Sequence, residues 1–101
     1  MPMRVILFLC RAEFSGHSEV EYAEAPTVGS EHDCILFVAQ AIETPDYEAA
    51  HCLLSKHGWI NARIKSAGPF QPESVNSQQW RVFQHNYEEC LEHGDSVVWY
   101  A

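Results

Sequence analysis

A chain of 101 residues, 47% hydrophobic and 20% charged, is long enough for one hydrophobic core, so residues 1–101 are predicted to form a single domain. This composition excludes an intrinsically disordered chain. The 14 acidic residues outnumber the six lysines and arginines, and the net charge of −8 argues against partners such as nucleic acid or an anionic membrane.

The first half of the chain predicts three strands. Residues 3–14 form an apolar run whose side chains point to both faces of a strand. Apolar and acidic residues alternate over 17–23, which is typical of an edge strand. After a turn at 26–30, the apolar run 33–43 favours a strand, because β-branched and aromatic residues are frequent and Thr44 and Pro45 follow. A helix is the alternative for this third segment.

A helix is predicted over residues 45–57. Thr44 can cap its first turn, Pro45 is suited to the first helical position, and Gly58 supplies a stop. Residues 59–66 then alternate between apolar and polar side chains. This pattern predicts a strand with one face in water.

The last part of the chain predicts a loop, a second helix and a final strand. Residues 67–73 contain one glycine and two prolines, which favour a loop. Asn76 and Gln79 resemble a capping box for a helix that runs to His93 and ends at Gly94. Residues 96–100 form a strand with apolar side chains on both faces.

These elements predict an α+β fold with a four- or five-stranded mixed sheet and two helices. Both helices are predicted to cover the same face, which gives a two-layer sandwich whose architecture resembles ferredoxin-like folds. The element order is atypical for such folds because no helix follows the first strand, and the resemblance implies no function. Helices on opposite faces would instead give a three-layer domain that needs no partner.

The four cysteines, at positions 10, 34, 52 and 90, form no CxxC pair. The first apolar run, 5–10, is shorter than the core of a signal peptide, and the run 34–42 is shorter than the roughly 20 residues that cross a bilayer. These observations predict a cytoplasmic protein whose cysteines are reduced, buried and inert.

No catalytic, metal-binding or cofactor-binding site is predicted. Cys90 and His93 lie three residues apart on the second helix, but no further paired ligands complete a zinc site. Cys34 follows His32 and Asp33 in an acidic stretch, which is a poor setting for an activated thiol. The pattern therefore favours a protein that is not an enzyme and needs no cofactor.

The apolar strands suggest an interface. If both helices share one face, the other face leaves large side chains uncovered, and the candidates are Phe8, Phe37, Trp99 and Tyr100. The function predicted first is a small, acidic, non-catalytic interaction or accessory protein. It would use an apolar sheet face to form a homodimer or to bind a protein partner.

The alternative is a cofactor-independent, oligomeric small enzyme or small-molecule-binding protein with a histidine in an apolar pocket. Histidine suits proton transfer near neutral pH, so His51 and His85 are candidate ligand contacts. Arg63 and Lys65 are two further candidates because they could attract an anion. Otherwise both basic side chains would face water or pair with the surplus acids.

Overall fold

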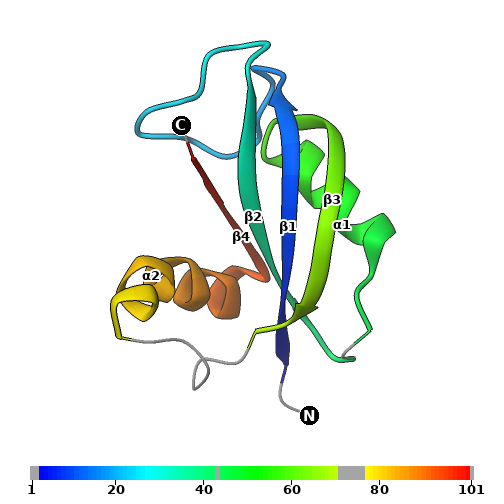
Figure 1. Ribbon diagram of the computed structural model, residues 1–101, viewed down its shortest axis with the longest axis vertical. Coiled ribbons are helices and arrows are strands. Elements are labelled where there is room, and N and C mark those ends of the chain that lie inside the picture. The colour runs from blue at the N-terminus through cyan, green and yellow to red at the C-terminus, as the bar shows by residue number, and fades with distance from the viewer. Residues whose placement is uncertain (1–2, 43, 71–76, 101) are drawn as a thin grey trace.

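The computed structural model describes residues 3–42, 44–70 and 77–100 (Figure 1). Its strands and helices, in chain order, are β1 (Arg4–Phe14), β2 (Glu31–Gln40), α1 (Tyr47–Lys56), β3 (Trp59–Pro69), α2 (Ser77–His93) and β4 (Asp95–Trp99). The strands form one sheet in the order β3-β1-β2-β4, and all neighbours are antiparallel. The α+β class is confirmed. The predicted mixed sheet is wrong, because no two neighbouring strands described here run parallel.

One face of the sheet is covered by α1. Ala50 and Leu54 of this helix join a buried cluster with Ile6 and Phe8, the even-numbered side chains of β1. Trp59 at the start of β3 also belongs to this cluster and is 1% exposed. Because alternate side chains of a strand point to opposite faces, the odd-numbered residues of β1 lie on the other side.

The opposite face is covered by α2. Cys90 of this helix is buried with Val5 and Phe37, and Phe83 and Tyr87 pack against the same cluster. The aromatic rings of Phe37 and Phe83 lie 5.9 Å apart. Among the described residues, therefore, the two helices lie on opposite faces of the sheet.

The chain thus has three layers, and the prediction that both helices share one face is wrong. A sheet that is apolar on both faces is destabilised when either face stays in contact with water. One helix on each face covers both apolar surfaces. A ferredoxin-like sandwich is not supported, since that resemblance implies two layers. The three-layer alternative describes the arrangement.

The helix α1 begins two residues later than the predicted start at Pro45. Its N-cap is Asp46, not Thr44: Ala49 donates its backbone N–H to Asp46 Oδ1 at 3.0 Å. A carboxylate at this position also interacts favourably with the positive end of the helix dipole. No helix in the described part of the chain is long and apolar enough to cross a membrane.

The strand predicted over 17–23 is not formed, and residues 15–30 are a connection without strand pairing. Ser15 and Glu19 donate their backbone N–H groups to Gly58 O and Lys56 O, each at 2.8 Å. Tyr22 donates its hydroxyl to His57 O at 2.6 Å. The segment therefore binds the end of α1 instead of extending the sheet.

The strand β3 continues to Pro69, past its predicted end at residue 66. Pro69 pairs with Ile6 and Ala67 pairs with Phe8, so part of the predicted loop belongs to the sheet. Proline is tolerated here because β3 is an edge strand. Residues 71–73 of that loop and the predicted cap at Asn76 lie outside the described residues, while the predicted helix end at His93 is confirmed.

Candidate functional site

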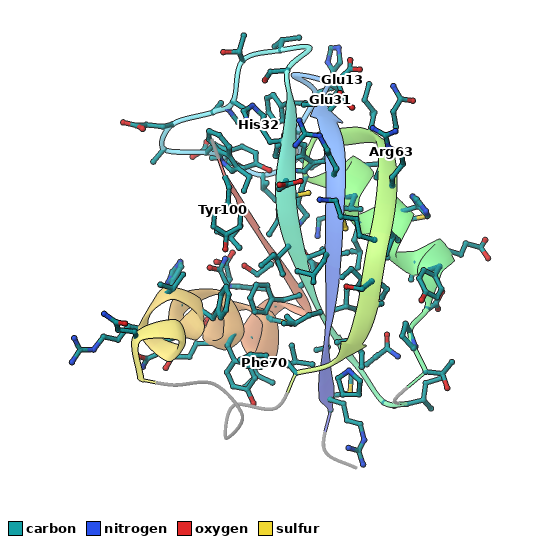
Figure 2. The ribbon with its side chains drawn as sticks, in the orientation of Figure 1. Glu13, Glu31, His32, Arg63, Phe70 and Tyr100 are labelled. Atoms are coloured by element: carbon teal, nitrogen blue, oxygen red, sulfur yellow. The ribbon has the colours of Figure 1, made fainter. Side chains whose placement is uncertain are left out.

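The helix α2 covers only one end of its sheet face, and the other end is open (Figures 1 and 2). Here Leu9 of β1 is 42% exposed and Tyr100, just after β4, is 40% exposed. We call this region the open sheet face. Its members are Leu9, Arg11, Glu13, Glu31, Asp33, Ile35, Arg63, Lys65 and Tyr100.

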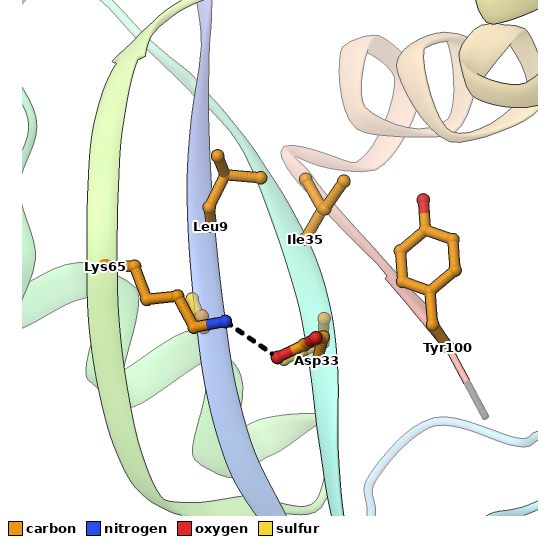
Figure 3. A pocket seen from close by; sticks show the side chains of 7 residues that line it. Leu9, Asp33, Ile35, Lys65 and Tyr100 are labelled. Atoms are coloured by element: carbon orange, nitrogen blue, oxygen red, sulfur yellow. Dashed lines mark hydrogen bonds and ion pairs between the residues drawn. The ribbon is translucent and has the colours of Figure 1, made fainter.

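A hollow of about 330 Å³ lies within the open sheet face (Figure 3). Leu9 and Ile35 form its apolar floor, Asp33 and Lys65 lie at one side, and Tyr100 lies at the other. Figure 3 shows the Tyr100 ring standing apart from the Lys65–Asp33 pair, across the floor of the hollow. The hollow thus combines an apolar surface with a polar border, as interaction sites commonly do.

The charged residues of the open sheet face are paired across strands. Lys65 Nζ lies 2.9 Å from Asp33 Oδ1, and the Arg11 guanidinium lies 3.3 Å from the same oxygen. Hydrogen bonds from Lys65 and then Arg11 lower the pKa of the Asp33 carboxyl. Arg63 lies 3.3 Å from a carboxylate oxygen of Glu31. These pairs occupy the basic groups that would otherwise attract an anion.

A bulge in β3 helps Lys65 to reach Asp33. Leu9 pairs with Ser66 while Cys10 pairs with Ile64, so Lys65 is an extra residue on β3. A bulge of this kind bends the strand and redirects the inserted side chain. The Lys65 side chain extends over β1 to the carboxylate on β2 (Figure 3).

Contacts with β2 hold Tyr100 and the preceding residue Trp99 in place. Tyr100 N–H donates to Asp33 O at 2.9 Å, and His32 Nδ1 lies 2.9 Å from Tyr100 O. The His32 ring also packs against Trp99, with ring centres 4.9 Å apart. Burial raises the pKa of the Tyr100 phenol. These contacts fix the aromatic ring beside the hollow.

A second hollow, of about 220 Å³, lies at the outer edge of β4. His57 lines this hollow and is buried, and its Nε2 lies 2.5 Å from Oδ1 of the buried Asp95. Its wall includes His85 and Glu89 of α2, whose side chains form an ion pair at 3.3 Å when His85 is protonated. This hollow is lined mainly by polar side chains, unlike the apolar pocket of the alternative prediction.

The structure separates the predicted interface residues. Phe8 and Phe37 are 0% exposed inside the single chain, on opposite faces, so neither can reach a partner. Trp99 is partly buried on the α1 side. Tyr100 alone of the four lies on the open sheet face.

The predicted ligand contacts fall in three places. His51 is exposed on α1 and lines neither hollow. His85 lines the hollow at the β4 edge. Arg63 and Lys65 pair with acids on the open sheet face, as their second interpretation predicts.

Three cysteines are buried as predicted, but Cys52 is exposed. Cys10 and Cys34 are cross-strand neighbours, and a hydrogen bond between their thiols lowers the pKa of Cys10 and raises that of Cys34. Burial raises the pKa of Cys90 to about 12. Within the described residues, no group of three or more His, Cys, Asp or Glu side chains could hold a metal ion.

Sequence reasoning missed Leu9, Asp33 and Ile35 as members of a site. Their signal was available in part, since apolar residues near the middle of β1 and β2 give way to charged residues toward one end. The His57–Asp95 pair carries no such signal, because 38 residues separate its members. Comparison of the chain with protein-family models, with curated proteins and with solved structures gave no match.

Proposed function

We propose that this chain is an interaction protein that pairs with a second copy of itself through the open sheet face. The observation that carries the proposal is the charge balance of this surface. Its members include three acids and three bases, so half of the chain's six lysines and arginines gather there. The other residues of the chain therefore carry the whole net charge of −8.

This charge distribution favours contact between two open sheet faces over other pairings of two copies. Two chains of net charge −8 repel each other, and the repulsion is weakest where each surface is locally neutral. In a twofold arrangement, the acids Glu31 and Asp33 of one copy can approach Arg63 and Lys65 of the other. A surface that carries both signs is self-complementary in this way.

Apolar contact supplies the attraction. Leu9 and Tyr100 are about two fifths exposed, and they flank the buried side chain of Ile35. Covering exposed apolar surface is favourable by about 25 cal/mol per Å² before the cost of association is subtracted. Leu9 and Tyr100 are therefore expected to contribute most of the binding energy.

The extent of the open sheet face limits the affinity. Four strands at a spacing of about 4.8 Å span roughly 14 Å across the sheet. A standard stable interface buries about 800 Å² per partner, which corresponds to a square patch of about 28 Å on each side, so the open sheet face is narrower than such an interface. We therefore expect a reversible dimer with a dissociation constant in the micromolar range or weaker.

The test is sedimentation velocity over a concentration series, with Leu9→Glu as the main variant. We expect the unaltered chain to show a monomer–dimer equilibrium and Leu9→Glu to remain monomeric. The matched control is Leu91→Glu, because Leu91 is 50% exposed on α2 and is not among the residues that line the hollow of the open sheet face. This control should dimerise like the unaltered chain.

A second variant separates loss of association from loss of folding. Tyr100→Glu places a charge on the exposed ring position after the end of β4 and should also give monomer. Circular dichroism and urea unfolding should show folded protein for all variants. A concentration-independent monomer in the unaltered chain, or dimers in both Leu9→Glu and Tyr100→Glu, would rule out the proposal.

A further inference from the structure

The hollow at the β4 edge contains a histidine that is almost completely buried. His57 is 5% exposed and Asp95 is 8% exposed, and they meet at 2.5 Å through His57 Nε2 and Asp95 Oδ1. His57 follows the last turn of α1, and Asp95 begins β4 just after α2. Lys56 Nζ lies 3.6 Å from the other Asp95 oxygen, which favours the ionised carboxylate.

This contact determines which ring nitrogen of His57 carries hydrogen. An ionised carboxylate can only accept a hydrogen bond, so Nε2 must be the donor. In the neutral imidazole, Nδ1 then has a free lone pair and acts as an acceptor. The identity of the ring tautomer thus follows from the position of Asp95.

The other ring nitrogen of His57 is Nδ1, and His57 is one of the residues that line the hollow. No described residue forms a hydrogen bond with His57 Nδ1. Within the described part of the chain, the one buried side-chain nitrogen or oxygen atom without a partner is Gln40 Oε1. His57 Nδ1 is therefore not sealed in the core, and His57 lines the hollow.

The other polar groups of this hollow are also mainly acceptors. Glu21 from the 15–30 segment and Glu89 from α2 contribute carboxylates. Asn86 uses its Nδ2 to donate to Ser96 Oγ at 2.8 Å, so its unused amide atom is the acceptor oxygen. His85 is the one further titratable histidine of the described lining, and it pairs with Glu89.

We propose that this hollow binds a small organic ammonium ion. A protonated amine brings several N–H donors and a positive charge, which complement the His57 acceptor and the carboxylates of Glu21 and Glu89. The volume of about 220 Å³ corresponds to about seven waters at about 30 Å³ each, so the ligand is a short amine and not a drug-sized molecule. The site is independent of the proposed dimer.

The test is an NMR titration of the full chain at pH 7.5 with butylammonium chloride. Butanol and sodium butyrate are the matched probes, because they share the alkyl chain and differ in charge. We expect saturable shifts of the backbone signals of Asn86, Glu89 and Val97 with butylammonium, and no saturable shifts with the other two probes. Equal responses to butanol and butylammonium would overturn the proposal.

Two glutamine variants locate the cation. Glu89→Gln should weaken butylammonium binding about two- to fivefold, the range expected for one partly exposed ion pair. Glu92→Gln is the control, since Glu92 lies on the same helix but does not line this hollow. An unchanged affinity in Glu89→Gln, or an equal loss in Glu92→Gln, would contradict the site.

Discussion

The ammonium group of Lys65 lies 2.9 Å from Asp33 Oδ1, although the strands that carry the two residues are not neighbours. The strand β1 runs between them, and its Arg11 approaches the same oxygen at 3.3 Å. One carboxylate thus connects β3, β1 and β2 at the border of the open sheet face. All three side chains remain largely exposed, so the cluster contributes little to folding and stays accessible to a second molecule.

Added salt should strengthen the proposed dimer. Two chains of net charge −8 repel each other at long range, and the Debye length falls from about 30 Å at 0.01 M to about 8 Å at 0.15 M. Because the open sheet face carries equal numbers of acidic and basic side chains, added salt should weaken the attraction between two such faces only slightly. Sedimentation velocity at low and at physiological salt measures the change. A weaker dimer in the higher salt would show that ion pairs between the two copies dominate instead.

Tyr22→Phe should destabilise the fold by about 1–3 kcal/mol. The Tyr22 hydroxyl donates to His57 O at 2.6 Å and accepts from Trp59 Nε1 at 3.1 Å. Removing this oxygen leaves the indole N–H of the buried Trp59 without its partner. Urea unfolding measures the loss. Tyr47→Phe is the control, since Tyr47 is 51% exposed, and its change should stay within about 0.5 kcal/mol.

Stability should fall at alkaline pH, and Tyr22 should account for part of the decrease. Burial raises the pKa of the Tyr22 phenol, with a smaller opposing effect from the Trp59 hydrogen bond. The unfolded chain releases this proton first, near the ordinary pKa of about 10. The free energy of unfolding therefore falls as the pH rises from about 10 through the raised pKa of the folded state.

Urea unfolding between pH 9 and pH 11 tests this dependence. The unaltered chain should lose stability more steeply than Tyr22→Phe, which lacks the ionising group. A decrease should persist in the variant because burial also raises the pKa of Tyr100. Identical slopes in the two proteins would contradict the role given to Tyr22.

Gly58→Ala should cost more stability than Gly94→Ala. Both glycines have a left-handed backbone, with φ of +94° and +97°, so alanine is strained at either position by about 1–2 kcal/mol. At Gly58, an added Cβ would also lie 2.8 Å from Phe14 Cε1, whereas nothing lies within 4 Å at Gly94. Phe14 packs against Trp59 and Tyr22 and has little room to move. Equal losses of unfolding free energy would contradict this account.

Most helices and strands were predictable from the sequence because their signals are local. The β-branched and aromatic content of residues 33–43 favours a strand, and β2 forms there. The pattern of 17–23 also resembles a strand. Yet Glu19 donates its backbone N–H to Lys56 O, so part of the backbone hydrogen bonding of this segment is made with α1 and not with the sheet. A local pattern does not reveal which distant carbonyl a segment will meet.

The layer arrangement could not be predicted for a related reason. The apolar stripes of α1 and α2 indicate that each helix packs on something, but they do not indicate which face of the sheet. Phe8 and Phe37 therefore looked equally suited to a helix or to a partner, and each lies under a helix. The surplus of acidic residues makes it predictable that Lys65 pairs with an acid. That this acid is Asp33 depends on the register of three strands, which the sequence does not reveal.

The central claim is that two copies meet through the open sheet face, and a dilution series of ¹⁵N-edited NMR spectra tests it most directly. We expect concentration-dependent shifts to concentrate on Leu9, Asp33, Ile35, Lys65 and Tyr100, with α1 signals unchanged. Spectra that do not change on dilution, or shifts that gather on the outer surface of α1, would contradict the claim.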